Sequence, residues 1–203
     1  MITLSEFKKA YSKAIQEGYA AIFAGAGLSK ASGFVNWKEL LNDLAQEIQL
    51  DVEKEPDLVE VAQYYCNEKR SRNEINEKIL NRFVTESQES ESIRILADLP
   101  IRVFWTTNYD HLLEDTLKKY GKRIDIKMTI ESLATNLSGN DAVVYKMHGD
   151  VRDPDNAVLT KDDYDKYGVS HSLFRTALRG DLISKTFLFI GFSFEDPNLD
   201  YII

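Results

Sequence analysis

Cysteine is almost absent from this chain, whose 203 residues include only Cys66. One cysteine can form neither an internal disulfide nor a zinc site built from several thiolates, so we expect a reducing, cytoplasmic environment. Cys66 lies in the helical pattern "QYYCNEK". We therefore interpret it as a packed thiol rather than a nucleophile.

Basic residues and long apolar runs are also scarce. The chain has 25 Lys and Arg against 33 Asp and Glu, a net charge of −8. Nucleic acids and anionic membranes are bound through a basic face, which this balance argues against. The apolar runs are too short to span a bilayer, and residues 1–17 carry charges throughout, unlike a signal peptide. We expect an acidic, soluble domain that binds neither nucleic acid nor membrane.

Strand-like and helix-like patterns alternate along the chain. Four apolar runs without in–out alternation lie within residues 19–25, 101–110, 142–150 and 186–192, and residues 123–129 alternate like a half-buried strand. Strands buried on both faces are typical of parallel sheets covered by helices. The predicted fold class is therefore α/β, with a Rossmann-like parallel sheet and helices on both of its faces.

Helical patterns fill the span between the first two strands. They begin at Asn36, run from Asp57 to about Thr85, and resume over residues 91–98, with no convincing strand between residues 33 and 101. We interpret residues 1–203 as one domain in which residues 36–99, approximately, form a helical insertion.

Four further helices are predicted outside this span. One is started by a Thr3–Glu6 capping box and stopped by Gly18, one ends near Gly121, one covers about residues 171–183 after a polar loop, and one opens at Pro197. The last would hold only seven residues, so we expect the chain to continue beyond residue 203.

The segment "IFAGAGLSKASG" (Ile22–Gly33) joins the first strand to a helix. Gly25 and Gly27 would let the backbone approach a phosphate, with the N–H groups of Ala26 and Gly27 and the Ser29 hydroxyl as donors. A ligand-free turn explains a lone Gly-x-Gly equally well. The third glycine also departs from the spacing of the common dinucleotide fingerprint.

Polar residues follow three other apolar strands: "TTNYD" ends the second, "HGD" a later one, and Gly191–Ser193 the last. Singly, each residue has a structural explanation, since Asn108 could cap a helix, Asp110 could complement a helix dipole and His148 could be a buried structural histidine. The carboxyl ends of parallel strands meet at one edge of a sheet. We therefore expect these residues and the glycine loop to line one crevice.

Four motifs together resemble a known family. "GAGLSKASG" (25–33), "TTNYD" (106–110), "MHGD" (147–150) and "GFSFEDPNL" (191–199) occur in the order found in sirtuins and, more closely, in the sirtuin-like (SIR2-like) domains of bacterial antiphage defence NADases. Deacetylating sirtuins carry four zinc-binding cysteines and a Pro–Asp–Phe–Arg segment, whereas this chain has one cysteine and reads "FVNWKELL" at 34–41. The resemblance therefore implies an NAD+ glycohydrolase without a metal, which depletes cellular NAD+ in abortive infection.

The same resemblance implies the roles of individual residues. Asn108 would orient the ribose and the attacking water, Asp110 would hold the nicotinamide carboxamide, and His148 would exchange a proton near neutral pH. NAD+ would be bound by Gly25, Ala26, Gly27, Ser29, Thr107, Gly191, Phe192 and Ser193. Phe23 and Phe34 are candidate walls of the nicotinamide pocket.

The remaining histidines and acidic residues are given structural roles. His111 is predicted on the exposed side of its helix, and His171 at the start of a later helix. We expect Glu195 and Asp196 to cap the last helix rather than to bind ribose. The acidic loop after His148 lacks the glycine and glutamate spacing of an EF-hand, so no metal site is predicted.

Three other functions stay open at this point. A non-catalytic NAD or ADP-ribose sensor would keep the glycine loop, an oligomerisation platform would depend on a partner for catalysis, and a protein deacylase is disfavoured by the missing cysteines. The resemblance further implies a homo-oligomer that works with a sensor or ATPase partner protein, or with a fused C-terminal domain.

Overall fold

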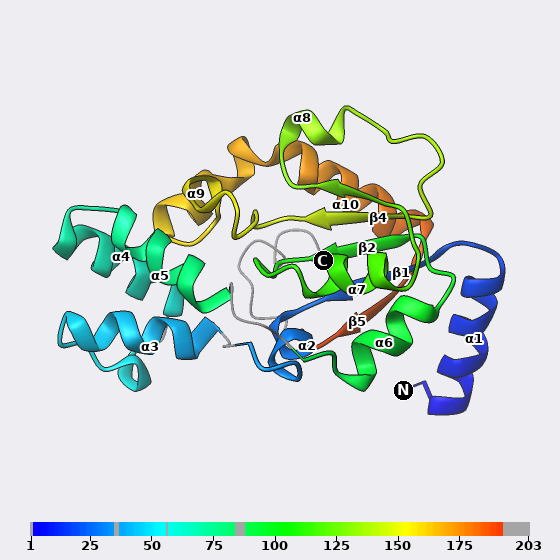
Figure 1. Ribbon diagram of the computed structural model, residues 1–203, viewed down its shortest axis with the longest axis horizontal. Helices are drawn as coiled ribbons and strands as arrows, with labels where there is room; N and C mark the ends of the chain where they lie inside the picture. The colour runs from blue at the N-terminus through cyan, green and yellow to red at the C-terminus, as the bar shows by residue number, and fades with distance from the viewer. Residues whose placement is uncertain (1, 35–36, 56, 84–87, 193–203) are drawn as a thin grey trace.

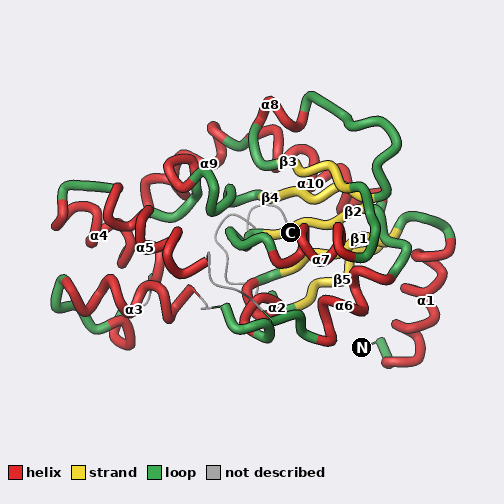
Figure 2. Tube along the Cα trace, viewed as in Figure 1, coloured by secondary structure: helices red, strands yellow, loops and turns green. Residues whose placement is uncertain are grey.

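The computed structural model describes residues 2–34, 37–55, 57–83 and 88–192. Five strands form one sheet in the order β3-β4-β2-β1-β5, and every neighbouring pair is parallel. Figure 2 shows these strands side by side, with helices around them. Their bounds are β1 (Ala20–Ala24), β2 (Val103–Thr106), β3 (Ile124–Lys127), β4 (Ala142–Lys146) and β5 (Thr186–Ile190). The predicted Rossmann-like α/β class is confirmed, with β2 and β5 on opposite sides of β1.

Burial along the strands explains their sequence patterns. All five residues of β1 are buried, as the apolar run "AAIFA" predicts for a central strand covered on both sides. The edge strand β3 alternates half-buried and buried positions, which confirms the half-buried pattern read from its sequence.

Helices cover both faces of the sheet (Figure 1). One face packs against α1 (Leu4–Gln16), α6 (Glu91–Asp98) and α7 (Leu112–Lys119), around a cluster that includes Ile22 and Phe104. The other face packs against α8 (Ile130–Leu133), α9 (Lys161–Ser170) and α10 (Ser172–Ser184), around Phe23 and Trp105. Burying each such large side chain stabilises the fold by roughly 1.5–3 kcal/mol.

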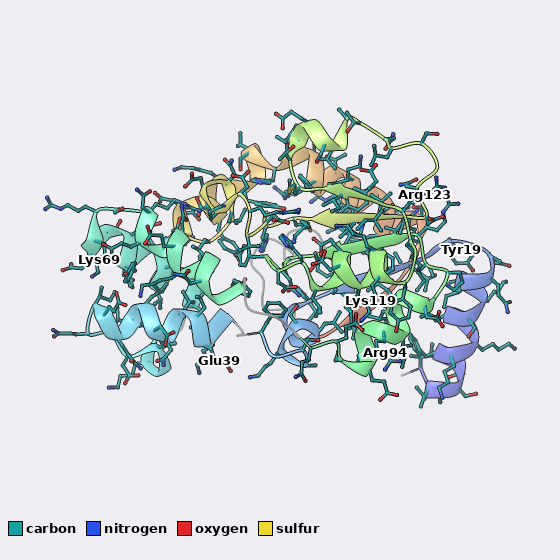
Figure 3. The ribbon with its side chains drawn as sticks, in the orientation of Figure 1. Tyr19, Glu39, Lys69, Arg94, Lys119 and Arg123 are labelled. Carbon is teal, nitrogen blue, oxygen red and sulfur yellow. The ribbon has the colours of Figure 1, made fainter. Side chains whose placement is uncertain are left out.

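A third group of helices lies beyond the carboxyl ends of the strands, at the left of Figure 1. It consists of α3 (Trp37–Glu47), the 3-10 turn η1 (Val52–Lys54), α4 (Leu58–Lys69) and α5 (Asn73–Phe83). Lys69 of this group, labelled in Figure 3, pairs with Glu47 and Glu74 at 3.8 Å each and so links all three helices. Their hydrophobic cluster also takes in Tyr109 and Val151, from the loops after β2 and β4. These helices are therefore packed against the loops that carry the candidate site.

Local sequence signals account for several helix boundaries. The Thr3–Glu6 capping box starts α1 as predicted, and α6 has the predicted bounds. The span after Asp57 divides into two helices because α4 ends at Arg70, which adopts a left-handed φ of 52°.

The polar loop predicted before His171 is wrong over residues 161–170. Those residues form α9, started by a capping box in which the Thr160 hydroxyl accepts from the Asp163 N–H and the Asp163 side chain accepts from Thr160. The short helix α8 also lies in a segment where no helix was predicted. The predicted helix starts at Asn36 and Pro197 lie outside the described residues.

Within the described ranges, no helix combines the length and apolar character needed to cross a membrane.

Candidate functional site

The parallel sheet brings four polar loops to one edge. β1 runs into Gly25, β2 into Thr107 and Asn108, β4 into Met147 and His148, and β5 into Gly191. This common edge is the place where ligands of open α/β sheets bind. The five-residue helix α2 (Ala26–Lys30) starts in the glycine loop, and the 3-10 turn η2 (Pro154–Asn156) lies in the loop after β4.

The glycines of the first loop are packed against the end of β5. Gly25 N–H donates to the Ile190 carbonyl at 3.0 Å and Gly27 N–H to the Gly191 carbonyl at 2.8 Å. A Cβ at Gly25 would meet the Gly191 oxygen at 2.5 Å, and one at Gly27 would meet the Gly191 Cα at 2.9 Å. Close backbone packing therefore requires both glycines, and the Gly27 N–H that was predicted to bind pyrophosphate already has an acceptor in this structure.

Asn108 links the second strand end to the glycine loop. Its amide Nδ2 donates to the Gly25 carbonyl at 3.0 Å and to the Ser29 hydroxyl at 2.9 Å. Its backbone N–H donates to the Thr106 hydroxyl at 3.0 Å, which turns the chain as it leaves β2. Because a carbonyl oxygen only accepts, the Gly25 contact fixes which end of the amide is nitrogen. Asn108 is half-buried, so its side chain is held in place while still partly accessible.

Asp110 is turned towards the protein interior. The residue is 3% exposed, and its Oδ1 accepts from the N–H of Leu112, the first residue of α7, at 3.0 Å. Its Oδ2 is buried without a hydrogen-bond partner. A small cavity beside it has room for about one water molecule. Its lining residues are Ala24, Leu28, Ser29, Ile93, Thr106, Asn108, Asp110, Leu112, Leu113 and Glu114. Nicotinamide does not fit this cavity, so a contact with Asp110 requires a rearrangement.

His148 is enclosed by aromatic rings from α9. It is 2% exposed, and its ring makes edge contacts with Tyr164 at 5.4 Å and Tyr167 at 5.8 Å between centroids. The Tyr167 hydroxyl donates to the Met147 carbonyl at 3.1 Å, one residue before the histidine. The two tyrosines lie in the segment that was predicted as a loop. Only the capping box at Thr160 signalled a helix there.

His171 stacks on the outer side of this aromatic group. Its ring lies 4.5 Å from that of Tyr167 with an interplanar angle of 2°. The predicted place at a helix start is confirmed, since His171 lies between the last residue of α9 and the first residue of α10. Burial and, secondly, the nearby His148 lower the pKa of His171 below its ordinary value.

The prediction for His111 is wrong. The residue is half-buried, and its Nε2 lies 2.7 Å from the Asp150 Oδ1, because the loop after β4 folds back over the start of α7. Asp150 also accepts from Arg152, and it pairs with Lys146 at 2.9 Å. Burial alone would raise the pKa of Asp150, but these hydrogen bonds and charges hold it well below its usual range. Lys146 was not predicted as a site residue, although a lysine inside the apolar run "AVVYKM" was a signal.

The remaining predicted residues are spread around the site. Phe23 stacks on Phe189 at 5.3 Å and meets Phe192 edge-on at 5.1 Å, on the face of the sheet opposite to the cavity. Phe34 stacks on Phe83 at 6.1 Å. Thr107 is half-buried. Ser193, Glu195 and Asp196 lie outside the described residues.

Thiol chemistry and metal binding are two further possibilities for this chain. Burial raises the pKa of the half-buried Cys66 thiol, in agreement with a packed, unreactive cysteine. No group of three or more His, Cys, Asp or Glu in the part of the chain that the structure describes could hold a metal ion.

Comparisons with known proteins identify relatives of this site. The sequence profile of the SIR2-like domain matches residues 102–203. The chain is 56% identical over 198 residues to NAD(+) hydrolase ThsA of Bacillus cereus (strain MSX-D12), an alignment that covers 97% of this chain and 42% of that protein. It is 52% identical over 191 residues to NAD(+) hydrolase ThsA of Acinetobacter baumannii (strain 532279), with 94% and 40% covered. Defense-associated sirtuin 2 of Bacillus subtilis is 27% identical over 204 residues, with 96% and 20% covered. The chain thus spans less than half the length of these curated relatives.

Proposed function

Because this chain belongs to the SIR2-like domain family, we propose that it hydrolyses NAD+ to nicotinamide and ADP-ribose. The observation that carries the proposal is the pair of hydrogen bonds from Asn108 to Gly25 and Ser29. They join the end of β2 to the glycine loop, so the residue expected to orient ribose sits against the residues expected to bind phosphate. Relatives named NAD(+) hydrolase support the same reaction.

The chemistry requires the bond between ribose C1′ and the nicotinamide nitrogen to break. The bonding electrons pass to the pyridinium ring, which leaves as neutral nicotinamide, and the transition state resembles an oxocarbenium ion. The oxygen of a water then bonds to C1′ and releases a proton. In the proposal, Asn108 orients the ribose and this water, and His148 accepts the proton from the water or from a ribose hydroxyl.

Binding of NAD+ is proposed to involve the glycine loop and the end of β5. Ala26 and Gly27 are exposed and can face the pyrophosphate, with Ser29, Thr107, Gly191, Phe192 and Ser193 completing the set. Since Gly27 N–H is bonded to Gly191, we expect Gly191 to shift when phosphate binds. Asp110 keeps one unpartnered carboxylate oxygen, which a carboxamide N–H could satisfy once the cavity opens.

At the level of the cell, we propose a cytoplasmic effector that depletes NAD+ and halts phage replication. The active species is expected to be a homo-oligomer that works with a sensor or ATPase partner or with a fused C-terminal domain. A relative named as a defence-associated sirtuin supports a role in defence. Residues 36–99 are proposed to act as a helical insertion that braces the loops after β2 and β4.

The direct test is product chromatography on the activated, full-length protein incubated with NAD+. Asn108→Ala, which loses the orienting amide, and His148→Ala, which loses the proton acceptor, are each expected to lower nicotinamide release by at least about 10²-fold. Asn67→Ala removes an exposed asparagine of α4 and should leave the rate unchanged.

The outcomes separate the hypotheses. Wild-type turnover in both site variants would contradict the mechanism. NAD+ left intact by the activated wild-type protein would instead favour a sensor that binds the nucleotide without cleaving it.

A further inference from the structure

A single ammonium group is buried between the two loops that carry Asn108 and His148. Lys146, the last residue of β4, is 0% exposed. Its Nζ donates to the carbonyls of Tyr109 at 3.1 Å and Asp110 at 2.5 Å. It also pairs with Glu114 at 2.8 Å and Asp150 at 2.9 Å. Such a charge is costly to bury, and these four oxygen partners offset that cost.

The group stays charged. Burial alone would lower the pKa of Lys146, but the carboxylates of Glu114 and Asp150 raise it above its ordinary value. Lys146 is therefore a permanent hydrogen-bond donor near neutral pH rather than a group that exchanges protons.

The Lys146 side chain links the two loops beyond the point at which β2 and β4 are paired. Parallel pairing of β2 with β4 ends at Thr106 and Lys146, followed by one bond from Met147 N–H to the Thr106 carbonyl at 2.9 Å. Beyond that point the Lys146 side chain reaches Tyr109, the neighbour of Asn108, while His148 lies two residues after Lys146 itself. The Tyr109 carbonyl also accepts from Val151 N–H at 3.0 Å, so the last residue of β4 and the loop after β4 both donate to it.

We propose that Lys146 is a positioning residue, whose ammonium fixes the Asn108 loop relative to His148. This inference rests on the proposed NAD+ hydrolysis. Lys146 touches no reacting atom in the proposal and acts through the backbone of Tyr109 and Asp110. Its loss should therefore slow the chemical step more than it weakens binding of NAD+.

The chain contains a matched control. Lys127 is the last residue of the edge strand β3 and is 2% exposed. It pairs at 2.7 Å with Asp125, a residue that is 4% exposed. It donates to the Thr135 carbonyl, away from the Asn108 and His148 loops. Lys146→Met and Lys127→Met thus each remove one buried, ion-paired ammonium, but only the first lies between the proposed catalytic loops.

The experiment measures kcat and KM for NAD+ in the activated full-length protein, with circular dichroism to verify folding. Lys146→Met is expected to lower kcat by about 10²-fold, the effect of a displacement of roughly 1 Å, with KM changed less than about threefold. Lys127→Met should retain kcat within about twofold. If Lys146→Met does not fold, Lys146→Met/Glu114→Gln, which also removes the carboxylate left without its partner, is measured with the same expectation.

The outcomes separate the positioning role of Lys146 from the proposed function. A wild-type kcat in a folded Lys146 variant overturns the positioning role while NAD+ hydrolysis stands. An equal loss of kcat in Lys127→Met also overturns it, because the loss then follows from removing any buried ammonium. A wild-type protein that releases no nicotinamide overturns the proposed function itself, and the positioning role with it.

Discussion

Single residues at the carboxyl edge of the sheet serve packing and the candidate site together. Gly191 has a φ of +64°, and a Cβ there would lie well inside contact distance of the Leu28 N. Its carbonyl accepts from Gly27 N–H, so the same backbone holds the glycine loop closed. A side chain at Gly191 would meet backbone atoms, which cannot turn away as a flexible side chain can.

Gly191→Ala is therefore expected to destabilise the fold. Strain at the left-handed φ and overpacking against Leu28 should lower the free energy of unfolding by about 1–3 kcal/mol in urea titrations. The control is Gly180→Ala, in the middle of α10, where a Cβ meets nothing within 4 Å. That change should raise the free energy of unfolding by up to about 1 kcal/mol. Equal effects of the two substitutions would contradict this account of the loop.

Among the helices, α9 and its junction with α10 pack beside His148. Tyr167 of α9 binds the Met147 carbonyl, and His171 at the junction stacks on Tyr167. The depressed pKa of His171 means that the folded protein prefers its neutral ring. The unfolded chain binds a proton there at a higher pH, so this group contributes stability above about pH 6.5 and loses it as the pH falls towards its folded pKa.

The pH dependence of unfolding tests that contribution. His171→Phe keeps a stacked ring and removes the titrating group. The variant should lose less stability than the wild-type protein when the pH is lowered from 7 to 5.5, as measured by chemical denaturation at both values. If both proteins lose the same unfolding free energy between pH 7 and 5.5, the neutral ring of His171 does not contribute to stability as stated.

At the scale of the whole molecule, polar contacts tie the α3–α5 group to the loop after β4 and to α9. Arg72, between α4 and α5, pairs with Asp163 at 2.7 Å and donates to the Ala157 carbonyl at 2.5 Å. Asn76 donates to Asp155 at 2.6 Å. Tyr109 lies in the hydrophobic cluster of the α3–α5 group, so the proposed catalytic loop after β2 also packs against these helices.

Arg72→Met should loosen this connection. Loss of the hydrogen bond between this guanidinium and the half-buried Asp163 carboxylate is expected to cost about 1.5–3 kcal/mol of unfolding free energy. Hydrogen exchange should increase in α4, α5 and α9, with little change in α1. Lys54→Met, which removes an exposed ion pair with Asp51, should give no measurable change. Faster exchange spread evenly over the sheet would contradict a local connection.

Much of this architecture could be predicted from the sequence because the signals are local. The buried run "AAIFA" indicates a central parallel strand from five adjacent residues, and the Thr3–Glu6 capping box starts α1 within a single turn. The same kind of signal at Thr160 was present but outweighed by the polar composition around it. Parallel strands then place the polar residues after β1, β2 and β4 at one edge whatever the details of packing.

Which atoms meet at that edge depends on contacts between distant parts of the chain. Asn108 and Ser29 are 79 residues apart, and Lys146 and Asp110 are 36 apart, so no local pattern states that they are bonded. Such pairings depend on how strands and helices pack, since a buried donor takes whichever acceptor the fold brings within reach. Local patterns, in contrast, are enough to predict the α/β class and the strand-end motifs. Only the folded chain decided that Gly27 N–H is bonded to Gly191, that His111 is bound to Asp150, and that Lys146 joins the loops of Asn108 and His148.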